Sequence, residues 1–200
     1  MKKTVKDTIM SVVVLFAIAF VCVALLSIAN EYLKYEAKLD EKMAKSLYAV
    51  CPTGEESDDD ALEYFEILKI DEQIESVNKA HGSPTTKVIA VYRAVKGVNE
   101  GSYIVQASSQ GNDGEVIMLT SYDKDGKIIK TTCYSQTESY WSLKIEGKYD
   151  GFEMLEGKEG EIKSDDIGVA TGATNSLSAV ARAVTLSNEM AKTLIEGGAV

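Results

Sequence analysis

Residues 171–176 read Thr-Gly-Ala-Thr-Asn-Ser and stand directly before an alanine-rich stretch that is typical of a helix. The first turn of a helix leaves backbone N–H groups without partners, and the helix dipole favours a negative charge beside them. A phosphate group can bind at such a place, and the small residues allow it to approach the backbone closely. Because hydroxyl-rich stretches are also ordinary helix caps and turns, the motif alone leaves both interpretations open.

The elements that must position this motif are a helix and a sheet. Residues 175–195 predict the helix, with apolar side chains spaced to face a core. Upstream, turns rich in glycine and aspartate separate four strand-like stretches, which are residues 88–95, 103–107, 115–122 and 127–134. Residues 61–80 predict one short helix followed by less regular chain. We therefore expect an α+β domain, built on an antiparallel β-meander with flanking helices.

The N-terminal part of the chain predicts a membrane anchor. Residues 8–30 contain no charged side chain, and residues 9–28 are dominated by aliphatic residues and phenylalanine. As a helix this stretch would measure roughly 34 Å, enough to cross a hydrocarbon layer of about 30 Å. A cleaved signal peptide has a shorter apolar region of about 7–15 residues, so we favour an uncleaved transmembrane helix. Lys2, Lys3 and Lys6 precede it and predict a cytoplasmic N-terminus, with the rest of the chain extracytoplasmic.

Between the anchor and the domain we expect a helical stalk and an acidic loop. Apolar and aromatic residues recur at steps of three and four from residue 31 to residue 50; they are Tyr32, Tyr35, Leu39, Met43 and Leu47. We expect this stripe to extend the transmembrane helix outward as a stalk, and its tyrosines to pack against the domain rather than to bind a cofactor. Residues 55–60 form an acidic loop without the spacing of an EF-hand. The expected organisation is residues 1–30 as tip and anchor, 31–60 as stalk and loop, and 61–200 as domain.

The charge of the chain excludes one class of partner. The formal net charge is −10, and because residues 1–30 carry +2, the remaining residues carry −12. Nucleic-acid binding depends on neutralising phosphates with Lys and Arg, so we expect no nucleic acid. The same acidity argues against the domain lying flat on anionic lipid.

Histidine and cysteine offer little further chemistry. His81 is the sole histidine and is expected in a surface loop, without a catalytic or metal-binding role. Cys22 lies within the predicted anchor, and a disulfide between Cys51 and Cys133 stays open. The chain has no Cys-x-x-Cys pair, so a zinc site or thiol redox motif has no support.

Residues 135–141 form a polar and aromatic loop after the last predicted strand and read Ser-Gln-Thr-Glu-Ser-Tyr-Trp. Tyr140 and Trp141 have large flat side chains that stack on planar ring systems. The alternative is that they pack in the core.

The order of these parts resembles one family. The chain resembles the FMN-binding domain family, in which the same parts follow one another in the same order. These parts are the anchor, the meander with turns at residues 111–116 and 123–128, the 135–138 loop and the Thr-Gly-Ala-Thr motif. That family includes the subunits that carry covalent FMN in the Rnf ion-translocating oxidoreductase and in the sodium-pumping NADH:quinone oxidoreductase. The resemblance covers nearly the whole chain, and the length suits the Rnf protein better.

The resemblance implies a covalent cofactor. In the family, a flavin transferase attaches FMN through a phosphoester to the final threonine of the motif, which is Thr174 here. By the same resemblance, the cofactor site also includes Glu138 from the loop, Thr171, Gly172 and Ala173 from the motif, and Ser176, whose hydroxyl would donate to a phosphate oxygen. Trp141 is added to this site as a residue whose ring could stack on the flavin.

The resemblance also implies a function and a location. The chain would be a single-pass protein of the cell (inner) membrane and an electron-carrying subunit of an Rnf-type complex, rather than a catalyst on its own. It would relay electrons among membrane and redox subunits, while the complex couples ferredoxin and NAD chemistry to sodium or proton movement.

The chain departs from the family pattern at three places. Gly168 stands where relatives have an acid, the 135–141 loop lacks the usual histidine, proline and glycine, and Leu177 replaces a second hydroxyl residue. Two alternatives therefore accompany the main interpretation. One is a stand-alone extracytoplasmic flavoprotein of another electron-transfer chain. The other is a membrane-anchored scaffold module, without flavin, in which the motif is a helix cap.

Overall fold

The computed structural model describes residues 10, 13–16, 19–20, 23, 40–54, 61–139, 141, 151–168 and 172–197. The chain divides into two units, Met1–Lys38 and Leu39–Val200. The second unit contains every strand and the long helix of the described chain, so it positions the candidate site.

In the first unit, the described residues are helical and expose their large apolar side chains, which belong to Met10, Val13, Val14, Leu15, Phe16, Phe20 and Val23. Among the described residues, no helix is both long and apolar enough to cross a membrane. Most of the expected anchor, residues 8–30, and the first part of the expected stalk, residues 31–39, lie outside the described residues. The transmembrane helix therefore stays a prediction.

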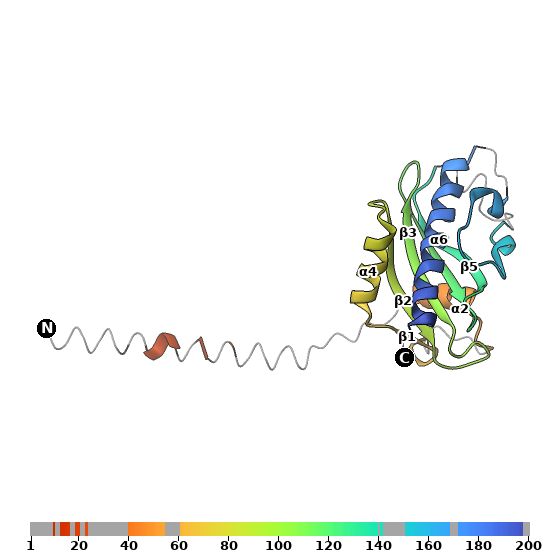
Figure 1. The fold of residues 1–200 in the computed structure, drawn as a ribbon. Coiled ribbons are helices and arrows are strands. Elements are labelled where there is room, and N and C mark those ends of the chain that lie inside the picture. Colours follow the sequence, from red (N-terminus) through yellow and green to blue (C-terminus); the bar gives the residue numbers. More distant parts are fainter. Residues whose placement is uncertain are drawn as a thin grey trace. The chain divides into compact units, whose positions relative to one another are not determined.

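The second unit is built on a five-stranded antiparallel sheet with the order β1-β2-β3-β4-β5 (Figure 1). The strands are β1 (Phe65–Ile67), β2 (Thr86–Ala94), β3 (Tyr103–Gln110), β4 (Glu115–Tyr122) and β5 (Ile128–Gln136). Each pairs with its neighbour in sequence, so the expected meander and the α+β class are confirmed.

Helices cover both faces of this sheet. The long helix α6 (Thr174–Glu196) packs on β2, β3 and β4, and α4 (Asp71–His81) packs on β2 and α6. On the other face, α2 (Glu41–Val50) packs on β4 and β5. The helix α3 (Ala61–Tyr64) leads into β1, and two short 3-10 helices, η2 (Glu153–Leu155) and η3 (Ser164–Ile167), precede α6.

The alternation of side chains along the strands supplies two cores, one on each face. Val105 belongs to the core beneath α6, while its neighbour Ile104 belongs to the core beneath α2. Val88 and Val91 face the α6 core although they are three residues apart, because the register of β2 shifts by one residue between Val88 and Ala90. Such a bulge restores the burial pattern that strict alternation would break.

The expectation for residues 61–80 is wrong in part. The stretch contains α3, the edge strand β1 and most of α4, rather than one short helix and irregular chain. Phe65 of β1 pairs with Ala94 and is fully buried. A strand of three residues is too short to display an alternation, and for this reason the pattern of apolar residues did not reveal it.

His81 also differs from its expectation, since it ends helix α4 instead of lying in a loop. Gly82 follows in the left-handed conformation with a φ of 70°, a common way to terminate a helix. The Nδ1 atom of His81 lies 3.0 Å from Oε2 of Glu189 on α6. His81 therefore joins α4 to α6.

The two cysteines of the second unit associate with different cores. Cys51 is buried in the α2 core, where burial raises the pKa of its thiol to about 11. Cys133 packs against the α6 core and pairs across the sheet with Met118. A bond between the two cysteines, which the sequence leaves open, would have to pass through the sheet.

Candidate site at the start of the long helix

The Thr-Gly-Ala-Thr motif leads into α6, and Thr174 is the first residue of that helix. The helix ends at Glu196, so the predicted helix is confirmed with bounds one residue longer at each end. Its N-cap is Ala173, whose methyl side chain has no oxygen to cap the helix. The first helical hydrogen bond runs from the N–H of Leu177 to the carbonyl of Ala173, at 2.9 Å. The N–H groups of residues 174–176 precede it and face the helix entrance.

Gly172 gives the chain its direction into the helix. Its φ is 87°, a left-handed conformation that other residues rarely adopt, and a Cβ there would meet open space. The backbone conformation, rather than crowding, therefore requires glycine at this position.

A cavity of about 300 Å³ opens beside the helix entrance. Its lining consists of Asn112, Glu138 and residues 172–176. The structure thus brings together five of the predicted site residues, Glu138, Gly172, Ala173, Thr174 and Ser176. Thr174 is exposed, whereas Ala173 and Ser176 are buried.

Two predicted site residues are not among that lining. Thr171 lies outside the described residues. Trp141 is 4% exposed and belongs to the α6 core, where its ring centroid lies 6.0 Å from that of Phe152. Of the two interpretations of Trp141, stacking on a cofactor or packing in the core, the described contacts fit packing.

Two asparagines in the lining were not predicted as site residues. Asn112 lies in the turn between β3 and β4, and Asn175 follows Thr174 on α6. The side-chain amide of Asn175 donates to Oδ1 of Asn112 at 3.2 Å. A glycine-bounded turn containing asparagine was visible in the sequence, but nothing there indicated that it meets the helix.

Glu138 connects its own loop after β5 to two other segments, the turn between β3 and β4 and the start of α6. Its carboxylate accepts hydrogen bonds from the backbone N–H groups of Asn112 (3.1 Å), Asp113 (2.8 Å) and Gly114 (3.1 Å). It also accepts a hydrogen bond of 2.5 Å from the hydroxyl of Ser176 on α6. The hydroxyl proton of Ser176, expected to bind a phosphate oxygen, is therefore engaged by Glu138.

The glycines of the turn make this contact possible. A Cβ on Gly111 would lie 2.4 Å from Oε1 of Glu138, and one on Gly114 would lie 1.7 Å from Oγ1 of Thr137. Both distances are far below van der Waals contact. Glycine at these two positions therefore allows the loop after β5 to press against the turn.

The hydrogen bonds decide the ionisation of Glu138. Burial acts to raise the pKa of its carboxyl, but the Ser176 hydroxyl and the backbone N–H groups of Asp113, Asn112 and Gly114 outweigh burial. The pKa of Glu138 consequently lies below its ordinary value of 4.5. At neutral pH the group is a carboxylate whose charge these donors compensate.

This lowered pKa predicts how stability depends on pH. The unfolded chain binds a proton at Glu138 more readily than the folded chain, so the carboxylate stabilises the fold above pH 4.5 and loses its effect as pH falls through the folded pKa. We expect wild type to be more stable than Glu138→Gln at pH 7, with a difference that shrinks below pH 4.5. Urea unfolding of both proteins from pH 3 to pH 7 measures this difference in unfolding free energy.

Because wild type and Glu138→Gln contain the same other carboxyl groups, the titration of those groups cancels from the difference in stability. The pKa of Asp166 is also lowered, mainly by a hydrogen bond from Lys158, and this group titrates equally in both proteins. A stability difference that stayed constant from pH 7 to pH 3 would contradict the assignment to Glu138.

A cation lies farther along the same helix. Arg182 is exposed, and its guanidinium donates from Nη2 to the carbonyl of Gln110 (2.6 Å) and from Nε to the hydroxyl of Ser109 (3.0 Å). Arg182 follows Thr174 by eight residues, which is about two helical turns. It anchors the end of β3, from which the turn with Asn112 departs.

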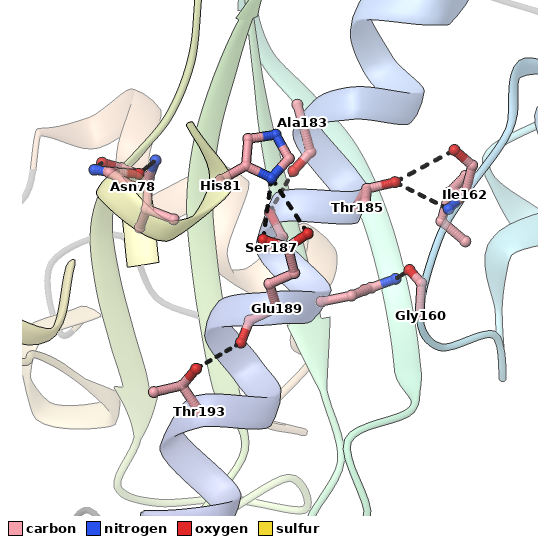
Figure 2. Close-up of polar contacts among 11 residues, drawn as sticks. Asn78, His81, Gly160, Ile162, Ala183, Thr185, Ser187, Glu189 and Thr193 are labelled. Carbon is pink, nitrogen blue, oxygen red and sulfur yellow. Dashed lines mark hydrogen bonds and ion pairs between the residues drawn. The ribbon is translucent and has the colours of Figure 1, made fainter. Parts of the chain in front are cut away.

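A second and larger cavity, of about 970 Å³, lies beside the C-terminal half of α6. Figure 2 shows part of its surroundings, where His81 meets Glu189 and Thr185 bonds to both backbone groups of Ile162. Five carboxylate side chains line it, those of Asp125, Glu159, Glu161, Glu189 and Glu196. Among the described residues, no cluster of side chains is arranged to hold a metal ion.

Comparison with known proteins adds no family to this description. No family model matches the chain, and no curated protein matches it.

Proposed function

We propose that this chain is a membrane-anchored flavoprotein that carries one FMN, attached to Thr174 by a phosphoester, and relays electrons as a subunit of an Rnf-type ion-translocating complex. The observation that carries the proposal is the position of Thr174. It is the exposed first residue of a long helix, it lines a cavity, and the helix follows a β-meander in the expected order.

The residues around Thr174 fit a flavin phosphate. The N–H groups of residues 174–176 and the helix dipole favour a negative group at this end of the helix. Ligand pockets measure about 300–1,000 Å³, so the cavity of about 300 Å³ suits the phosphate end of a flavin nucleotide. The nearby negative charge of Glu138 is already compensated by four donors, which weakens its repulsion of a phosphate.

Each residue at the entrance has a definable task. In attachment by the flavin transferase, Oγ1 of Thr174 would bond to the phosphorus of a flavin dinucleotide while the pyrophosphate bond breaks, and the hydroxyl proton would leave with the nucleoside monophosphate. Gly172 and Ala173 allow close approach to the backbone, and the amides of Asn112 and Asn175 offer donors and acceptors at the cavity. FMN would supply the redox chemistry, while the protein supplies position and electrostatics.

The proposal includes a location outside the cytoplasm. Residues 8–30 would form the single membrane-spanning helix of a cell (inner) membrane protein, with the lysines before it on the cytoplasmic side. A covalent bond keeps the flavin with a protein that faces the outside, where a dissociated cofactor would be lost. The partners are then the other membrane and redox subunits, and the transferase during maturation.

Intact-mass spectrometry tests the proposal. The full-length protein is produced with and without a flavin transferase, and the expected mass increase is one FMN less one water, only when the transferase is present. No added mass under either condition would overturn the proposal and favour the scaffold module. Added mass without copurifying membrane redox subunits would instead favour the stand-alone flavoprotein and overturn the assignment to an Rnf-type complex.

A further inference from the structure

The carboxylate of Glu138 has no acceptor capacity left for a ligand. Oε1 accepts from the N–H groups of Asp113 and Gly114, and Oε2 accepts from the N–H of Asn112 and the hydroxyl of Ser176. Each carboxylate oxygen has two lone pairs, so these four bonds occupy all four acceptor sites. The residue is also only 5% exposed, which leaves little of its surface for contact with a bound molecule.

The three N–H groups of the turn are likewise occupied. Successive backbone N–H groups that converge on one point form a concave anion-binding site. In this chain the anion is supplied by Glu138 itself, with N···O distances of 2.8–3.1 Å. A cofactor phosphate at this site would therefore have to use the helix entrance at residues 174–176 and not the turn.

Glu138 also determines where Asn112 lies. The backbone of Asn112 is bonded to Oε2 of Glu138, which is bonded in turn to Ser176 on the first turn of α6. The Asn112 side chain donates to Asp113 (2.7 Å) and accepts from Asn175 (3.2 Å), next to Thr174. One carboxylate thus connects the turn to the helix entrance and places an amide in the cavity lining.

We propose that Glu138 is a positioning residue that does not touch the cofactor, and that it acts by holding Asn112 against the start of α6, where Asn112 contacts the flavin nucleotide on Thr174. This inference rests on the proposed function, since it concerns the same site. It changes the role of Glu138 from a cofactor ligand to a support for one, and it adds Asn112 as a contact residue.

The first arm of the test needs no flavin. Amide hydrogen exchange is measured on full-length wild type and on Glu138→Gln made without transferase. A glutamine has one oxygen where the carboxylate has two, so we expect exchange at residues 112–114 to become about ten- to a hundredfold faster. Glu115→Gln is the matched control, because the Glu115 side chain is exposed and forms a surface ion pair with Lys87, at 3.4 Å. Unchanged exchange in Glu138→Gln would overturn the proposal.

The second arm measures the rate of FMN attachment per folded molecule with the transferase present. We expect Glu138→Gln and Asn112→Ala each to slow attachment about tenfold, and the double variant to be no slower than either single variant, because both changes remove the same contact. A general loss of structure would not produce this coupling. Additive effects, or a normal rate in either single variant, would overturn the role of Asn112.

Two outcomes separate this inference from the function on which it rests. If wild type takes up no flavin, the proposed function is wrong, and so is the contact of Asn112 with a flavin. The amide-exchange measurement then still shows whether Glu138 holds the turn at residues 112–114. If Glu138→Gln does not fold, Ser176→Ala replaces it, since it removes one donor and keeps the carboxylate. We then expect Ser176→Ala to accelerate amide exchange at Asn112 and to slow FMN attachment. The absence of either effect would overturn the proposal.

Discussion

Under the proposed function, replacing Thr174 with alanine is expected to abolish covalent flavin, from one FMN per molecule to an undetectable level. A phosphoester requires a hydroxyl oxygen, and Thr174 presents one at the exposed end of α6 beside the cavity. Alanine keeps the helix, because it has the highest helix propensity, so the loss would not come from unfolding. In-gel flavin fluorescence under denaturing conditions and intact mass both measure the attached cofactor.

Two variants sharpen this test. Thr174→Ser keeps a hydroxyl at the same place and is expected to retain covalent FMN. Thr193→Ala removes an exposed threonine near the other end of the same helix, where its hydroxyl bonds to the carbonyl of Glu189, and it is expected to leave attachment unchanged. A fluorescent band that persists in Thr174→Ala would assign the flavin to another residue and refute the site.

The sheet and the long helix could be predicted from the sequence because their signals are local. Strand β4 was predicted with its observed bounds, Glu115–Tyr122, since turns with glycine and aspartate stand directly before and after it. Helix α6 was predicted to within one residue at each end, because its apolar residues repeat with the helical period over 23 residues.

The elements that were missed have weak local signals. Strand β1 has three residues, and it exists because Phe65 pairs with Ala94 at the edge of the sheet. The bulge in β2 could not be predicted from the sequence either, since it depends on which residues of β3 lie opposite. Both features arise from pairing between segments that are distant in the sequence.

The candidate site divides in the same way. The motif around Thr174 could be recognised from residue types and order, and Glu138 could be assigned to the site. The partners of Glu138 could not, because the three N–H groups lie 24–26 residues before it and Ser176 lies 38 residues after it. For Trp141 the sequence left stacking on a cofactor and packing in the core both open, and the structure places its side chain in the α6 core.

Helix α2 provides the second large expected effect. The sequence predicts a stalk that extends the anchor, whereas the structure packs α2 on β4 and β5. Leu47 is fully buried in this core, together with Phe65 and Leu119. Leu47→Ala would remove apolar contacts and leave a cavity, which costs about 2–5 kcal/mol of unfolding free energy in comparable cores.

Urea unfolding of the full-length protein, followed by circular dichroism, measures this loss. Lys45→Ala is the matched control on the same helix, because its side chain is 58% exposed and its ion pair with Glu41 lies at the surface. We expect the control to change stability by less than about 1 kcal/mol. If Leu47→Ala were equally mild, α2 would not stabilise the sheet, and the interpretation of residues 41–50 as a stalk would regain support. A loss of several kcal/mol would instead make α2 an integral layer of the domain that positions Thr174.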